Sequence, residues 1–438
     1  MSADTDTAPG LKRVVSGRLL FLFILGDVLG AGIYALVGTL AGEVGGAIWV
    51  PLLAALLLAL LTASSYAELV TKYPRAGGAA VFAQRAFGHD TVSFLVGFCM
   101  LAAGITSVAG LALAFSGDYL GALLDVPAVP AALVFLALVA LLNLRGIRDS
   151  LRANVVMTVV EVAGLLFVVA LGVLVLGRGE GSLERVVEFS PDHSPAVGIL
   201  AATVIAFYSF VGFETSANLA EEALDPSRTY PRALFGGLAV AGAVYVLVGL
   251  AVGATVDTAA IVDSDGPLLE VVRVADVGVP GWLYAVVALV AVANGALLTS
   301  IMSSRLTYGM AREGLLPPVL ARVLPGRRTP WVAILVTTAA SGLLLASGSL
   351  ASLAATVVLL LLVVFVSTNL AVLRLRRDRV EHAHFRAPTA LPVLGVVCSL
   401  ALMTQLEADV WWRAAVLLVV GLVIHLLTRG RSRRLTRP

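Results

Sequence analysis

The chain has 438 residues, of which 59% are hydrophobic and 13% are charged, and its formal net charge is +2. Soluble domains average about 45–50% apolar and about 25% charged residues, so this composition excludes an ordinary soluble protein. Both cysteines, Cys99 and Cys398, fall inside hydrophobic runs and offer neither a disulfide framework nor the spacing of a metal site.

Apolar runs along the chain predict an all-α polytopic membrane protein with about 12 transmembrane helices. A helix needs roughly 20 mostly apolar residues to cross a bilayer. The runs do not alternate with period two, which argues against an outer-membrane barrel. Some runs are short, so eleven or twelve spans are expected, and the polar residues 1–10 predict no cleaved signal peptide. The predicted spans are 19–40, 47–69, 92–114, 129–144, 153–176, 197–219, 233–256, 282–306, 331–346, 350–373, 391–406 and 411–427.

Basic residues lie almost entirely on one side of the predicted membrane. All but four of the 30 Lys and Arg residues fall in the two tails and in every second loop. Short cytoplasmic loops retain Lys and Arg, so this bias predicts a multi-pass protein of the cell membrane with both termini in the cytoplasm. The arginine-rich tail 429–437 could be a nucleic-acid patch, but the same rule favours an anchor that contacts anionic lipid, and no nucleic-acid partner is expected. The four exceptions are Arg178, Arg185, Arg273 and Arg413.

Three polar connections carry further predictions. Residues 73–88 follow a Gly turn and are predicted to form an interfacial amphipathic helix on the inner side. The acidic outer loop 257–281 is expected to form a short external helix. The inner segment 374–386, with five arginines and two histidines, is predicted to be a solvated anchor.

The first and sixth spans share an irregularity. Span 1 reads Leu29-Gly-Ala-Gly-Ile-Tyr34, and span 6 reads Ala206-Phe-Tyr-Ser-Phe-Val-Gly-Phe-Glu214. Five spans separate the starts of these helices, so they cross the membrane in opposite directions. Matching broken helices predict a five-plus-five inverted repeat with the substrate site at the breaks in helices 1 and 6. The alternative is that small residues merely allow close helix packing. The predicted division is a tail 1–18, a first repeat 19–176, an inverted second repeat 197–373, two added helices 391–427 and a tail 428–438.

Broken helices expose backbone groups that suit a zwitterion. Irregular backbone at this depth is tolerated only against protein or a water-filled cavity. The amide end of a half-helix favours a carboxylate, and the carbonyl end favours an ammonium group. The predicted carboxylate ligands are the backbone amides of Gly30, Ala31, Gly32 and Ile33, and the predicted amine ligands are the carbonyls of Ser209, Phe210, Val211 and Gly212. Tyr208 is expected either to cover the site or to pack against span 10.

Three carboxylates are counted within spans, namely Asp27, Glu161 and Glu214. A charge at a helix centre costs about 2.5–3.5 kcal/mol on insertion scales, so each is expected to be protonated, to face water or to accept hydrogen bonds. Glu161 or Glu214 is the predicted carrier of a coupled proton, whereas Asp27 could equally be a structural acceptor. Asn294 in span 8 is expected either to line the cavity or to join helices.

Four stretches resemble the amino acid–polyamine–organocation (APC) superfamily of amino acid permeases, and the likeness covers about residues 15–320. The resemblance implies the five-plus-five core with two added helices, alternating access, and an amino acid or related amine as substrate. It also implies that span 1 binds the carboxylate, while span 6 binds the amine and supplies an aromatic gate. Several proton-coupled relatives carry a lysine in the middle of span 5, where this sequence has Glu161, so their lysine mechanism does not transfer. The stretches are Gly30–Tyr34; Pro74–Gly78 with Ala86–Gly88; Phe210–Glu214 with Asn218–Glu222 and Asp225–Arg228; and Ser304–Gly314.

Other classes of function fit the sequence less well. The five histidines lie in loops or near span ends without nucleophile or metal-ligand spacing, so neither an enzyme nor a cofactor or metal site is predicted. No repeated pore segment indicates a channel. A non-transporting sensor on the same fold stays an alternative, because fold does not fix function. Proton symport and exchange both remain open, a small or neutral amino acid is favoured as substrate, and the oligomeric state is not predicted.

Overall fold

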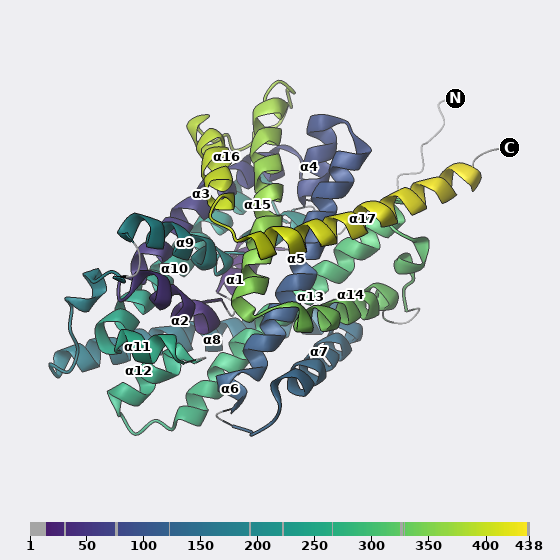
Figure 1. Ribbon diagram of the computed structural model, residues 1–438. Helices are drawn as coiled ribbons and strands as arrows, with labels where there is room; N and C mark the ends of the chain where they lie inside the picture. The colour runs from purple at the N-terminus through teal and green to yellow at the C-terminus, as the bar shows by residue number, and fades with distance from the viewer. Residues whose placement is uncertain are drawn as a thin grey trace.

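The computed structural model is almost entirely helical (Figure 1). It describes residues 15–29, 32–74, 78–121, 123–191, 194–220, 223–264, 266–324, 327 and 329–435. In these ranges nine helices are long and apolar enough to cross a membrane, and a further pair, α1 and α2, forms a span bent by 41°. Two shorter apolar helices add to these. The prediction of a polytopic helical membrane protein is therefore confirmed.

The observed helices follow the predicted spans closely. The first span is divided into α1 (Gly17–Val28) and α2 (Gly32–Val44), and the sixth into α9 (Pro195–Tyr208) and the 3₁₀ helix η2 (Phe213–Leu219). The other spans are α3 (Trp49–Lys72), α5 (Asp90–Ser116), α7 (Ala128–Arg145), α8 (Ile147–Gly177), α10 (Pro226–Thr255), α13 (Gly281–Arg312), α14 (Trp331–Leu344), α15 (Leu350–Leu375), α16 (Ala390–Met403) and α17 (Ala408–Leu435).

Short helices occupy the two ends of the bundle. The segment predicted to be interfacial contains α4 (Gly78–Phe87), and the acidic outer loop contains α11 (Thr258–Val262) and α12 (Pro267–Ala275). In Figure 1, α11 and α12 lie at the lower left, whereas α4 and the C-terminal end of α17 lie at the upper right. The remaining short elements are α6 (Asp118–Gly121), η1 (Arg185–Val187), η3 (Pro318–Ala321) and η4 (Leu345–Ser347).

Helix packing is symmetric between the two halves of the chain. The first helix α1 packs on α10, and its counterpart five spans later, α9, packs on α3. In the same way α8 packs on α13, and α15 packs on α5. Exchanging each helix for the one five spans away reproduces the contacts, which is the pattern expected of an inverted five-plus-five repeat.

Burial separates the central helices from those at the periphery. In the apolar window of α5, 72% of residues are buried, against 22% for α17. Peripheral helices expose large apolar side chains such as Leu343 and Trp412. Such surfaces are stable only against lipid, so α17 belongs to the rim and α5 to the core that surrounds the two broken helices.

One arginine of the polar segment after α15 departs from the prediction of a solvated anchor, whereas the other four arginines of 374–386 are exposed. Residues 376–389, here named the strap, lie along the C-terminal end of α3. Arg376 binds the Glu68 carboxylate through Nε at 3.0 Å and Nη2 at 2.7 Å, and the Ala387 amide donates to Glu68 Oε2 at 2.9 Å. Glu68 is only 2% exposed, so these contacts from the strap compensate a buried charge.

Glu68 also corrects the count of intramembrane carboxylates. It lies inside the predicted span 47–69, and only three carboxylates were counted within spans. An arginine, Arg376, reaches this carboxylate. This ion pair could not be predicted from the sequence, because Arg376 lies 308 residues away from Glu68.

We expect Arg376→Gln to destabilise the protein by about 3–5 kcal/mol, because it leaves the Glu68 charge buried without a partner. The matched control is Arg273→Gln, which breaks a pair whose arginine side chain is 61% exposed and should cost about 0–1 kcal/mol. The measurement is the melting temperature of both variants in the same detergent. Equal melting temperatures would show that the strap does not depend on this ion pair.

Candidate functional site

The interruptions of the first and sixth spans lie against each other. Helix α1 ends at Val28 and α2 begins at Gly32, and the predicted ligands Gly30 and Ala31 fall outside the described residues. A Cβ at Gly32 would lie 2.7 Å from Ser209 Cα, closer than real Cβ contacts come. Only glycine at position 32 therefore allows α2 to begin directly beside the end of α9.

Gly212 makes the second close approach. Its φ of +127° is a left-handed conformation that favours glycine. A Cβ there would also lie 2.7 Å from the Asp27 carbonyl oxygen. The break in the sixth span is thus pressed against the last turn of α1.

Tyr245 on α10 connects the carbonyl ends of both half-helices. Its hydroxyl lies 2.6 Å from the Val28 carbonyl oxygen and 3.1 Å from the Ser209 carbonyl oxygen. A carbonyl has two lone pairs, so Ser209 retains a site for a second donor. Tyr245 could not be selected from its sequence context, because it stands alone among apolar and small residues in its span.

Two carboxyl groups flank Gly212. Glu214 Oε2 accepts a hydrogen bond from the Gly212 amide at 3.0 Å. The Thr215 hydroxyl hydrogen-bonds to Asp27 Oδ2 and also lies 2.7 Å from the Gly212 carbonyl oxygen. Asp27 and Glu214 are 7% and 2% exposed, so the structure brings both predicted acids together beside the breaks.

A cavity of about 70 Å³ opens beside the two breaks. By the volume that one buried water occupies, it holds on the order of five water molecules, about the size of a small amino acid. None of the described lining residues is a lysine, an arginine or a histidine. The lining comprises Asp27, Val28, Gly32, Met100, Ala103, Gly104, Ser107, Leu111, Tyr208, Ser209, Val211, Gly212, Glu214, Thr215, Asn218, Gly295, Thr299, Met302, Ser303, Leu306, Val357 and Leu361.

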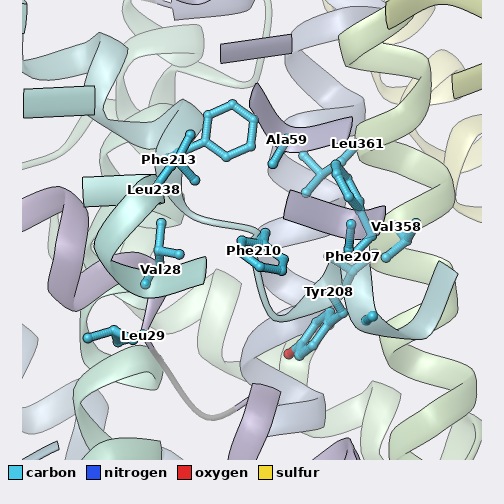
Figure 2. Packing of buried hydrophobic residues seen from close by; sticks show 14 of the residues in the cluster. Val28, Leu29, Ala59, Phe207, Tyr208, Phe210, Phe213, Leu238, Val358 and Leu361 are labelled. Carbon is cyan, nitrogen blue, oxygen red and sulfur yellow. The ribbon is translucent and has the colours of Figure 1, made fainter. Parts of the chain in front are cut away.

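The aromatic residues of the sixth span divide between the cavity and the core. Tyr208 lines the cavity, and its hydroxyl lies 3.1 Å from Ser107 Oγ. Figure 2 shows the Tyr208 hydroxyl pointing away from Phe213. Phe207, rather than Tyr208, packs on Phe365 of α15, with ring centroids 5.8 Å apart. Phe210 is fully buried against the Tyr245 ring at 5.2 Å.

Not every predicted site residue lines the cavity. Gly32, Tyr208, Ser209, Val211, Gly212, Asp27 and Glu214 line it. Ile33 and Phe210 are buried and are absent from its lining, as are Glu161 and Asn294. Sequence analysis missed the lining residues of α5 and α13, such as Ser107 and Thr299, because small polar residues in apolar runs carry no distinctive signal.

Glu161 and Asn294 form a second polar cluster, between α8 and α13. Both are 0% exposed. Asn294 faces the Glu161 carboxyl, but the two Glu161 oxygens and Asn294 Oδ1 have no hydrogen-bond partner in the described part of the chain. Asn294 Nδ2 lies 3.4 Å from Thr158 Oγ1, which in turn lies 3.3 Å from Asn154 Oδ1.

The protonation state of Glu161 follows from this geometry. An ionised carboxylate without a partner is expensive to bury. A protonated carboxyl carries an O–H donor, and Asn294 Oδ1 is an acceptor in the same cluster that has no partner in the described ranges. The cluster is therefore suited to a neutral Glu161. Within the described ranges, no group of three or more His, Cys, Asp or Glu side chains is placed to hold a metal ion.

Known proteins resemble the chain along nearly its whole length. A sequence model of the amino acid permease family matches residues 18–424. The chain is 26% identical to the branched-chain amino acid permease BcaP of Bacillus subtilis, over 99% of this chain and 97% of that protein. It is 27% identical to the methylthioribose transporter of Bacillus subtilis, over 95% of this chain and 93% of that protein. It is 28% identical to the low-affinity putrescine importer PlaP of Escherichia coli, over 83% of this chain and 81% of that protein.

We expect Gly32→Ala to weaken substrate binding at least tenfold, because the added methyl group must push Ser209 and the end of α9 away. Such overpacking also costs about 1–3 kcal/mol of stability. The control is Gly309→Ala in α13, where a Cβ meets nothing within 4 Å; it should keep binding and add about 0.5–1 kcal/mol. Ligand-induced thermal shifts of both variants measure the effect. If Gly32→Ala binds substrate as the parent protein does, the close contact between Gly32 and Ser209 is not needed for substrate binding.

Proposed function

Because the chain belongs to the amino acid permease family, we propose that it carries an amino acid or a closely related amine across the cell membrane by alternating access, coupled to protons. The observation that carries this proposal is the cavity at the two crossing breaks, where backbone ends and two acids face a space of amino acid size. Sites of this kind at mid-membrane are typical of inverted-repeat transporters. Both termini are proposed to be cytoplasmic, from the distribution of Lys and Arg.

A zwitterion fits the polar side of the cavity. The N-terminus of α2 at Gly32 borders it, and the positive end of a helix dipole favours a carboxylate. We assign the carboxylate to the amides from Gly30 to Ile33. The amine is assigned to the carbonyl side, near Ser209 and the Glu214 carboxyl. Ser209 Oγ supports this assignment, because it is buried and has no partner in the described part of the chain.

The side of the cavity formed by α5, α13 and α15 is mainly apolar and would receive the substrate side chain. Its polar residues, Ser107, Thr299 and Ser303, are uncharged, and no described basic residue is available to pair with an acidic substrate. This supports a small neutral amino acid. The relatives named for methylthioribose and putrescine keep an uncharged or cationic amine-like substrate as the alternative. The apolar lining is formed by Met100, Ala103, Leu111, Met302, Leu306, Val357 and Leu361.

The function is tested with purified protein in liposomes and radiolabelled amino acids. We expect an imposed inward proton gradient to drive accumulation of a small neutral amino acid into empty liposomes. Putrescine and glutamate serve as cationic and acidic comparisons. Uptake only into liposomes preloaded with amino acid would favour an exchanger. A protein that binds amino acids but moves none would be a sensor, and no response to any amino acid or amine would contradict the proposal.

Glu161 is the proposed proton carrier. Its carboxyl is fully buried without a partner, and Asn294 offers an acceptor for its proton. By contrast, Glu214 already accepts the Gly212 amide at the substrate cavity. We therefore assign the coupled proton to Glu161, and substrate contact to Glu214. Asp27 is assigned a structural role through Thr215.

We expect Glu161→Gln to lose proton-driven accumulation but to retain counterflow exchange, because glutamine keeps the shape of the side chain and cannot take up a proton. The control, Glu180→Gln, alters an exposed residue beyond α8 and should leave both activities unchanged. Glu214→Gln is expected to weaken substrate affinity in both assays. Full accumulation by Glu161→Gln would show that the proton binds elsewhere.

A further inference from the structure

We propose that the inner end of the bundle holds a site for a phosphate-bearing anion, as carried by the headgroup of an anionic phospholipid, between α3, α4 and the strap. The site is separate from the substrate cavity and does not depend on which substrate is carried. It is a surface cavity of about 300 Å³. Its lining includes Lys72, Tyr73, Arg85, Asp378, Val380 and His382.

Lys72 supplies an ammonium group that is fixed in place by two carbonyl oxygens. The residue is 4% exposed. Its Nζ donates to the carbonyl oxygens of Leu375 and Asp378, both at 2.6 Å. Nζ also lies 5.6 Å from the centroid of the Tyr73 ring. An ammonium group has three donors, so one is not used by these carbonyl oxygens and faces the cavity side of the Tyr73 ring. Among the described residues, no carboxylate oxygen lies within 4.0 Å of Lys72 Nζ.

Arg85 supplies the geometry that phosphate requires. Its guanidinium carbon lies 4.4 Å from the centroid of the Tyr73 ring, so the group is held against an aromatic face. The same guanidinium also interacts with the Tyr73 hydroxyl. A guanidinium has five N–H donors, so its remaining donors can match two phosphate oxygens. The Tyr73 hydroxyl donates to Asp378 Oδ2 at 2.5 Å, which fixes the ring between α4 and the strap.

The local charge is in surplus. Glu68 is neutralised by Arg376, which leaves Asp378 as the acid in the lining. Lys72 and Arg85 line the cavity, and Arg386 is close enough to act on the Lys72 charge. Within the lining, two cations therefore face one carboxylate, a surplus of one formal positive charge, which the single negative charge of a phosphodiester headgroup would balance.

The position of the site favours a lipid as the source of the phosphate. Arg85 is exposed on α4, the helix whose sequence predicts a location at the membrane interface. Basic clusters on the cytoplasmic side of a membrane attract anionic headgroups. A bound headgroup would join α4 to the strap. The strap in turn contacts α10, where Phe235 and Phe385 rings lie 5.6 Å apart, so binding would stabilise the inner ends of several helices together.

The test uses the purified full chain in detergent. Its melting temperature is measured with added phosphatidylglycerol, with phosphatidylcholine, and with inorganic phosphate, and native mass spectrometry counts retained lipids. We expect phosphatidylglycerol to raise the melting temperature and phosphatidylcholine to leave it unchanged. Stabilisation by inorganic phosphate as well would identify a soluble anion as the occupant of the same site. No response to either anion would overturn the proposal.

Substitutions place the effect at this site. Arg85→Gln should lower the apparent affinity for the stabilising anion about tenfold, and Arg85→Lys, which keeps the charge but loses the fork, about threefold. Arg379→Gln is the control, because Arg379 is exposed on the strap and outside the lining, and it should bind as the parent protein does. If Arg85→Gln cannot be purified, the comparison of Arg85→Lys with Arg379→Gln decides. Equal affinities would overturn the proposal.

Discussion

A bilayer interior supplies no water to backbone groups, so the two interrupted helices depend on the partners that the fold gives to their exposed amides and carbonyls. Tyr245 lies on the carbonyl ends of α1 and α9, and the Glu214 carboxyl accepts the Gly212 amide. These partners come from α10 and from the turn itself. Gly32 lets the two breaks touch, and the rest of the substrate cavity forms around that contact.

Among the described residues, three of the four buried acids have a partner that offsets the cost of a carboxyl in the membrane. Glu68 has an arginine, Glu214 has a backbone amide, and Asp27 has a threonine hydroxyl. Glu161 has no hydrogen-bond partner for its carboxyl oxygens in the described ranges. The pairings of Glu68 and Asp27 join separate segments of the chain and so stabilise the arrangement of helices seen in this structure. The lack of such a partner is what distinguishes Glu161, the proposed proton carrier, from the other three.

The helical spans and both breaks could be predicted because they depend on local properties, namely the length of apolar runs and glycines near mid-span. Lining residues on α5 and α13 could not, since Ser107 and Thr299 look like any small residue in an apolar helix. Another reason explains why two kinds of contact could not be predicted, namely those of Tyr245 and the ion pair between Glu68 and Arg376. They join residues 36 to 308 positions apart, and only the packed bundle brings them together.

Neighbouring residues of α1 contact both the Glu161 cluster and the substrate cavity. A Cβ at Gly26 would clash with the Thr158 hydroxyl, so α1 fits closely against the polar side of α8. The next residue, Asp27, lines the substrate cavity and meets Thr215 of the sixth span. Proton movement at Glu161, as proposed, would alter the packing of Thr158 and Asn294 against α1. Gly26 and Asp27 are adjacent residues of one helix that ends at the break, so a shift of α1 at Gly26 would be expected to shift Asp27 in the cavity wall as well. The contact between Gly26 and Thr158 would therefore couple the proposed proton site to the proposed substrate cavity through α1.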